Sequence, residues 1–297
     1  MFDLRYHVAS LAAVFLALVI GILVGVGLSG RGFVGEAERK NLTGQIGDLR
    51  AERDTALAQL EAAQGAGAAL EEYAERTYPA LVPRKLDGMS IALVFAGSVD
   101  QAVVGAVTEA VRDAGGAIER MRALRMPLDG DGVDEALRGR IATRSLAGVD
   151  QRTALGRELG RELVSGGALP LWTQLEGVIV EERSGELRSP VDGVVVARPV
   201  APQQGETQDF LTGLYGGLVR AGRPAVGVDT ASRAFPAVPA FKRAGLSTVD
   251  SVETDAGRLA LVLVLAGGPA GSYGVEGEAA DGVVPTVAPA APPAPGE

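Results

Sequence analysis

Residues 8–28 read VASLAAVFLALVIGILVGVGL and contain no charged side chain. At a rise of about 1.5 Å per residue, this stretch would be roughly 30 Å long as a helix, which matches the hydrocarbon core of a bilayer. The apolar run continues to Leu28 without the shorter length and small-x-small cleavage site of a secretory signal peptide. A buried core helix would normally carry a polar stripe. We therefore expect an uncleaved signal anchor that crosses a membrane once.

Small side chains recur at every fourth position of this stretch, which places them on one face of the helix. The positions that we expect in a helix–helix interface are Ala13, Ala17, Gly21 and Gly25. A face of this kind lets a second membrane helix approach closely. The alternative is that an Ala- and Gly-rich helix shows such spacing by chance, because GxxxG alone is a weak signal.

Charges beside the helix do not determine its orientation, since Arg5 precedes it while Arg39 and Lys40 follow it. Residues 1–7 form a short stub that is easily left in the cytoplasm, and long domains translocate largely regardless of such charges. We expect a plasma-membrane protein with a cytoplasmic amino terminus and an extracytoplasmic soluble domain.

Residues 33–78 carry a heptad pattern after the membrane helix, and Pro79 and Pro83 are expected to end this helical segment. The apolar positions that we assign to a dimer interface are Leu42, Ile46, Leu49 and Leu60. Arg53 and Gly67 interrupt the pattern, so a coiled coil here would be marginal on its own. The alternative is one solvated helix supported by charge pairs on its surface. We favour a homodimer, because the small-residue face of the membrane helix indicates the same partner.

Residues 87–276 alternate short apolar runs with helical patterns, which is typical of a Rossmann-like α/β domain with a mostly parallel sheet. The expected strands are 90–96, 117–124, 192–197, 224–229 and 246–252. Ser98 is expected to cap the first helix of this domain. Arg120 and Arg122 indicate a wetter face on the second strand. Residues 277–297 are rich in Pro and Ala and are expected to be disordered.

The composition excludes several classes of function. A net charge of −9 argues against a nucleic-acid-binding surface. Cysteine is absent and the only histidine, His7, adjoins the membrane helix, so the chain lacks Ser-His-Asp and Cys-His catalytic devices. We therefore expect no enzyme and no cofactor.

Two glycine- or aspartate-rich segments resemble ligand loops without matching them. The first expected strand is followed by Gly97-Ser98-Val99-Asp100, which is not the GxGxxG of a dinucleotide site. Residues 129–134 read DGDGVD, but Asp134 stands where a calcium loop needs glycine. We expect a solvated loop at 129–134 and another loop at 267–274.

Three segments carry a likeness to a known family: LRYHVASLAAVFLAL at 4–18, STVDSVETDAGR at 247–258 and SYGV at 272–275. With the heptad segment between them, they resemble the actinobacterial copper transporter family, the copper transport protein B family. The resemblance implies a cell-envelope protein in copper homeostasis or efflux, described in places as an outer-membrane channel. Related proteins are linked to cell division and wall remodelling with a membrane partner.

The residues themselves offer little for direct copper binding. Copper(I) favours thiolate, thioether and imidazole ligands, whereas this chain has no cysteine, one histidine and four methionines. Met121 and Met126 are the candidates for a metal site, with packing as their alternative role. We expect a dimeric module that binds a protein partner in the envelope and meets copper only indirectly. The alternatives are a scaffold for cell division or wall remodelling and a domain that senses a small ligand.

Overall fold

The computed structural model describes residues 4–29, 33–140, 143–231, 235–277 and 279–286. The chain divides into two compact units, Met1–Ala68 and Ala69–Glu297. Residues 30–32, between the two expected helices, lie outside the described residues.

The first unit consists of one long helix and most of a second, whose last residues belong to the second unit. Helix α1 spans Leu4–Ser29 and α2 spans Phe33–Leu81. Within the described residues, Tyr6–Gly27 is the one helical stretch long and apolar enough, by length and composition, to cross a membrane. Helix α2 runs through Pro79 instead of ending there. Two interactions hold the end of the helix. Tyr78 and Val82 are buried, and the Val82 N–H donates to the Tyr78 carbonyl at 3.1 Å.

The second unit is an α/β domain, as the sequence predicts. In chain order its elements are β1 (Ser90–Ala96), α3 (Gln101–Asp113), β2 (Ala117–Leu124), α4 (Gly130–Arg138), two 3-10 turns (Arg144–Leu146 and Val149–Gln151), α5 (Arg152–Ser165), α6 (Pro170–Ile179), β3 (Val180–Ser184), β4 (Gly193–Ala197), α7 (Gly205–Arg220), β5 (Ala225–Val228), α8 (Val238–Ala244), β6 (Ser247–Val249), α9 (Asp255–Leu265) and β7 (Ser272–Tyr273). The described strands form a seven-stranded sheet in the order β3-β2-β1-β4-β5-β6-β7. All neighbours are parallel except β2 and β3.

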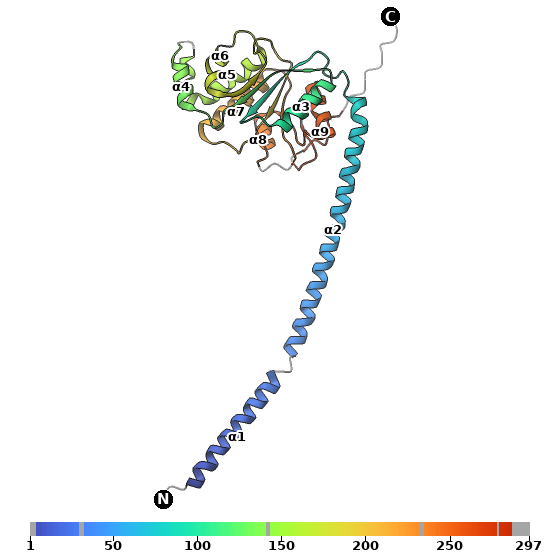
Figure 1. Ribbon diagram of the computed structural model, residues 1–297, viewed down its shortest axis with the longest axis vertical. Helices are drawn as coiled ribbons and strands as arrows, with labels where there is room; N and C mark the ends of the chain where they lie inside the picture. Colours follow the sequence, from blue (N-terminus) through green and yellow to red (C-terminus); the bar gives the residue numbers. More distant parts are fainter. Residues whose placement is uncertain (1–3, 30–32, 141–142, 232–234, 278, 287–297) are drawn as a thin grey trace. The chain divides into compact units, whose positions relative to one another are not determined.

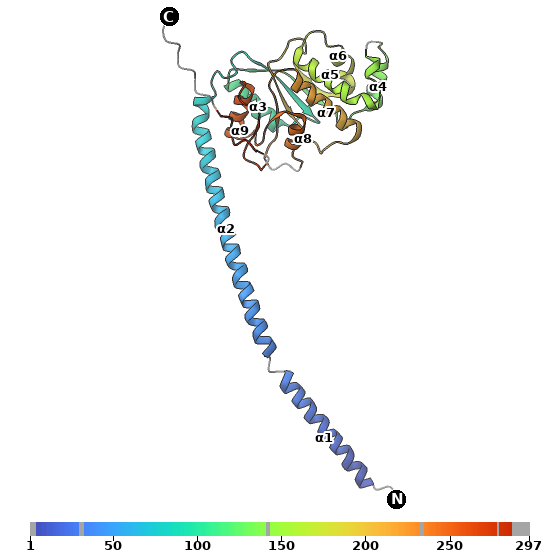
Figure 2. The ribbon, with the colours of Figure 1, turned by 180° about the vertical axis from the view of Figure 1, so that it is seen from behind.

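The sheet has an apolar core on each face because alternate residues of its central strands point in opposite directions. Ala92 and Val94 of β1 face one cluster, which includes side chains of α5, α6, α7 and α8. Leu93 and Phe95 face the other cluster, which includes side chains of α3 and α9. Figures 1 and 2 show these helices on opposite sides of the sheet. Coverage of both faces explains why the central strands β1, β4 and β5 are almost continuously apolar.

The predicted helix cap after β1 is corrected by two residues. Asp100, and not Ser98, precedes α3, and its Oδ1 accepts from the backbone N–H groups of Ala102 at 2.9 Å and Val103 at 3.3 Å. A carboxylate satisfies free amides at a helix start and also favours the positive end of the helix dipole. The helix therefore begins at Gln101.

The predicted wetter face of β2 is wrong, because Arg120 and Arg122 are almost completely buried. Arg120 donates to the carbonyl groups of Leu163, Leu187 and Ser189. Arg122 donates to the Ser184 and Gly185 carbonyls. The two guanidinium groups are thus internal donors that hold the segment after β3 against the sheet, and arginine supplies enough donors to do this.

Two expected loops contain regular structure. The 129–134 segment begins α4, whose N-cap is Asp129, so it is not a solvated loop. Within 267–274, Ser272 and Tyr273 form β7, paired with β6. Part of the predicted tail also packs on the domain, since Asp281 bonds to Ser272 through its backbone and side chain and Val284 contacts the core. Residues 278 and 287–297 lie outside the described part.

Candidate functional site

The small-residue face of α1, which we define as Ala13, Ala17, Gly21 and Gly25, lies along an exposed helix. A Cβ added at Gly21 or Gly25 would meet no atom within 4 Å. Spacing of four residues keeps these positions on neighbouring turns of one side. A second helix could therefore approach this face with little side-chain bulk between the two backbones.

The heptad face of α2, which we define as Leu42, Ile46, Leu49 and Leu60, is also exposed. These side chains are 47–63% exposed, a high fraction for residues of this type. The interruptions Arg53 and Gly67 are exposed as well, and Arg53 pairs with the adjacent Asp54 at 2.6 Å. The structure thus places all four predicted interface residues of α2 on surface that the described chain does not cover.

The two candidate copper ligands are not brought together. Met121 is partly buried and packs against the cluster that contains α3 and α9. Met126 is partly buried and packs against the cluster that contains α5 and α7, on the other face of the sheet. Among the described residues, no group of three or more His, Cys, Asp or Glu side chains is arranged to hold a metal ion.

The carboxyl end of α2 is packed on the sheet domain, in contrast to the heptad face. Arg258 of α9 lies over the ring of Tyr78, with its guanidinium carbon 5.5 Å from the ring centroid. It also forms ion pairs with Asp255 and with Glu109 of α3. Burial raises the pKa of Tyr78 to about 12. A cation over an aromatic face and two carboxylates beside it tie α2, α3 and α9 together.

The 247–258 and 272–275 segments, which carry the family resemblance, meet at one structural junction. The carboxylate of Asp250, 2% exposed, accepts from the backbone N–H groups of Val275 at 2.8 Å and Glu276 at 3.2 Å. A Cβ at Gly274, whose φ is +141°, would collide with this carboxylate. Thr254 caps α9 by accepting from the Gly257 N–H at 3.0 Å. The motif therefore builds the edge of the sheet and the helix that supports α2.

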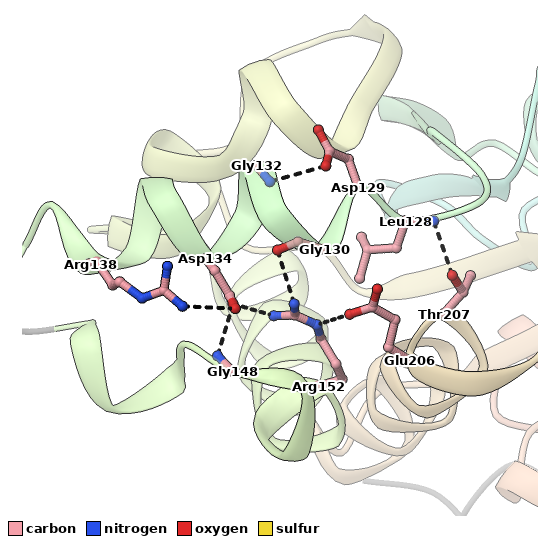
Figure 3. Close-up of polar contacts among 10 residues, drawn as sticks. All are labelled: Leu128, Asp129, Gly130, Gly132, Asp134, Arg138, Gly148, Arg152, Glu206 and Thr207. Carbon is pink, nitrogen blue, oxygen red and sulfur yellow. Dashed lines mark hydrogen bonds and ion pairs between the residues drawn. The ribbon is translucent and has the colours of Figure 1, made fainter.

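Arg152, 2% exposed, is the centre of a polar network that joins α4, α5 and α7 (Figure 3). Its guanidinium donates to Asp134 at 2.7 Å, to Glu206 at 2.9 Å and to the Gly130 carbonyl at 3.0 Å. Asp134 also accepts from the Gly148 N–H at 2.8 Å. Although burial raises the pKa of Asp134, the hydrogen bonds from Arg152 and Gly148 outweigh that effect and lower it.

Two of the carboxylates that make residues 129–134 similar to a calcium loop, Asp129 and Asp134, have structural partners here. Asp129 caps α4 through the Gly132 N–H, and Asp134 pairs with Arg152 and Arg138 (Figure 3). Sequence reasoning did not find Arg152, because its partners lie 18 and 54 residues away along the chain. The one available signal was its position at the start of an amphipathic helix, α5.

Apolar protein atoms pack closely beside the point between β1 and β4 where the strand order reverses. This is where open α/β sheets commonly bind nucleotides. Gly97 follows β1 with a φ of +121°, and a Cβ there would collide with the side chain of Val200 in the β4–α7 loop. Gly97 thus allows the Val200 side chain to pack directly against the backbone after β1.

The chain matches the family described as copper transport outer membrane protein, MctB, over residues 1–285. The copper transporter MctB of Mycobacterium tuberculosis (strain ATCC 25618 / H37Rv) is 28% identical over 309 residues, which covers 92% of this chain and 96% of that protein. The copper transporter MctB of Mycobacterium leprae (strain TN) is 26% identical over 311 residues, with 93% and 96% covered. The chain therefore belongs to the copper transport outer membrane protein family MctB.

Proposed function

We propose that this chain is a homodimeric envelope protein that serves copper homeostasis as an anchored binding module and not as an enzyme or a pore. Its amino terminus lies in the cytoplasm, α1 crosses the plasma membrane once, and the sheet domain lies outside. The family match over residues 1–285 carries the link to copper. The relatives share this link by name, since both are called copper transporters.

Two continuous interface candidates support the dimer. The small-residue face of α1 allows close approach of a membrane helix. The heptad face of α2 exposes Leu42, Ile46, Leu49 and Leu60, which a second copy would cover in a coiled coil. The one candidate membrane helix among the described residues cannot enclose a pore by itself, because a closed wall needs several helices or a barrel.

The donor set supports indirect handling of copper. Soft ligands are few, and Met121 and Met126 pack on opposite faces of the sheet. We propose that the sheet domain engages a protein partner in the envelope, and that copper passes through that partner.

Complementation tests this function. A strain that lacks the gene is expected to become sensitive to copper salts, and the full chain restores growth. The Met121→Leu/Met126→Leu variant should restore it equally, whereas Gly21→Leu/Gly25→Leu should not, at matched protein levels. Unchanged copper tolerance after deletion would contradict the copper role. Failure of the methionine variant alone would contradict indirect handling.

A further inference from the structure

A cavity of about 450 Å³ opens at the carboxyl end of β4, between the β4–α7 loop, α7 and α8. Its size lies within the usual range for small-molecule sites, roughly 300–1,000 Å³. In parallel sheets the carboxyl ends of strands are the common place for ligands. Val200 of the β4–α7 loop packs against Gly97 after β1, whereas the cavity is lined by other residues of that loop together with α7 and α8.

Two buried polar side chains in the cavity lining lack a complete set of partners. Arg198 follows β4 and is 6% exposed; its Nη2 donates to the Pro236 carbonyl at 2.9 Å, and its Nε has no acceptor among the described residues. Tyr215 of α7 is 3% exposed, and its hydroxyl has no hydrogen-bond partner in the same described part of the chain. A buried donor that stays unpaired has lost its hydrogen bonds to water without a replacement, which is unfavourable. Such groups at a cavity wall therefore point to a ligand.

The lining is also cationic. It contains Arg198 and Arg243 and no Asp or Glu. Within the described part of the chain, neither arginine has a carboxylate at ion-pair distance. Burial raises the pKa of Tyr215, although the charge of Arg198 lowers it in part, so the hydroxyl keeps its proton and remains a donor.

The rest of the lining suits a ligand with hydroxyl groups. Gln203, Gln208 and Thr212 supply amide and hydroxyl groups, while Leu211 and Ala240 give an apolar wall. The larger cavity of the domain, about 790 Å³, differs in its charges. There Glu176 pairs with Arg122 at 3.1 Å and also with Arg183, so two of its three arginines already have a counter-ion.

We propose that the cavity beside β4 binds a small organic acid, with its carboxylate held by Arg198 and Tyr215 and its hydroxyl groups facing the amides of α7 and the preceding loop. Arginine matches a carboxylate because its N–H donors form a planar fork. This site is separate from the dimer interface and from the copper role, so either can fail without the other.

Calorimetric titration of the full chain in lipid nanodiscs tests the site. The probe is glucuronate, and the control is glucose, which has a similar ring without the carboxylate. Glucuronate should bind at millimolar concentration or below, and glucose should not. Arg198→Gln should weaken glucuronate binding by at least about tenfold, as expected for loss of a buried charge-assisted hydrogen bond.

Three further variants keep the test decisive. Thr212→Phe fills the cavity from its exposed rim without touching Arg198 and should abolish binding, even if Arg198→Gln fails to fold. Arg243→Gln removes an exposed charge and should weaken binding by about threefold. Arg220→Gln changes an arginine of α7 outside this cavity and should leave binding unchanged. The proposal is overturned if wild type does not bind glucuronate, if glucose binds equally, or if folded Thr212→Phe binds normally.

Discussion

Glycines spaced four residues apart occur in two places with opposite surroundings. We call the contact of α5 with α7 the packed seam, and Gly21 and Gly25 of α1 the open seam. Gly156 and Gly160 of α5 face Gly213 and Gly217 of α7, and an added Cβ at any of them would collide with backbone of the other helix. Gly21 and Gly25 of α1 repeat the same spacing, but an added Cβ there would meet nothing within 4 Å. The spacing permits close approach in both places, and only in the sheet domain does the same chain supply the second helix.

The packed seam also has a polar connection that α1 lacks. Arg152 at the start of α5 reaches Glu206 in the first turn of α7, so the two helices are joined by an ion pair as well as by contact of their backbones. The comparison teaches that this spacing makes a helix contact in the sheet domain, while on α1 the described chain leaves it uncovered. We propose that a second copy of α1 covers it.

The largest effect is expected when the polar connection is broken. Arg152→Met should lower the free energy of unfolding of the sheet domain by about 3 kcal/mol, at the low end for a broken buried ion pair because Glu206 is partly exposed. Trp172, the only tryptophan and fully buried, reports unfolding by fluorescence in denaturant. Arg161→Met, which removes an exposed pair with Glu158 on the same helix, should change stability by less than about 0.5 kcal/mol. Equal losses for both variants would refute the role of the network.

The packed seam itself is tested within one helix. Gly213→Ala forces a Cβ into the Thr153 carbonyl and should cost about 2 kcal/mol of unfolding free energy, as overpacking exceeds the gain in helix propensity. Gly216→Ala, three residues along, meets only the end of the Arg220 side chain at 3.6 Å. That control should be stabilised by about 0.5–1 kcal/mol. Denaturation followed by Trp172 fluorescence measures both variants. If Gly213→Ala is as stable as the wild type, the helices do not need this close approach.

Substitutions in the open seam should weaken the association of α1 helices without changing the stability of the sheet domain. Gly21→Leu/Gly25→Leu is expected to weaken dimerisation in bilayers by about tenfold, equivalent to about 1.4 kcal/mol, because the bulk separates the backbones. Unfolding of the sheet domain should not change. Fluorescence energy transfer between labelled chains over a range of lipid dilutions measures this. The control Ile22→Leu/Val26→Leu changes side chains beside the seam and should associate as wild type does.

The smallest effect is expected from Tyr78, at the packed end of α2, whose contribution to stability depends on pH only in the alkaline range. The pKa of Tyr78 is raised in the folded state to about 12, so the folded state keeps its proton where the unfolded chain would lose it above about 10. This contribution to stability is complete below pH 10 and is lost as pH rises towards 12. Tyr78→Phe should remove that part of the alkaline loss and change little at pH 7. Tyr73→Phe, at an exposed position of the same helix, should leave the pH profile unchanged.

Sequence patterns determined much of the fold because strands buried on both faces leave a clear apolar signal. The ranges 90–96 and 117–124 coincide with β1 and β2. What the patterns missed depends on partners distant along the chain. The buried arginines of β2 look like surface residues until the carbonyl groups of Leu187 and Ser189 are placed beside them.

The candidate sites divide in the same way. The faces of α1 and α2 could be predicted, since periodicity along one helix defines them. The cavity with Arg198 and Tyr215 could not, because a loop, α7 and α8 build it from separate segments. Met121 and Met126 are five residues apart in sequence but face opposite cores, since a strand reverses its face at every residue and β2 ends between them.

Cysteine cross-linking tests the proposed dimer most directly, because the chain has no cysteine of its own. Gly21→Cys and Leu49→Cys, placed one at a time in the full chain in native membranes and oxidised, should each give a disulfide-linked dimer. Leu23→Cys and Ala51→Cys, two residues along and thus on the far side of each helix, should not. Cross-linking confined to the predicted faces is the result expected. Absence of any dimer, or equal cross-linking from both sides, would contradict it.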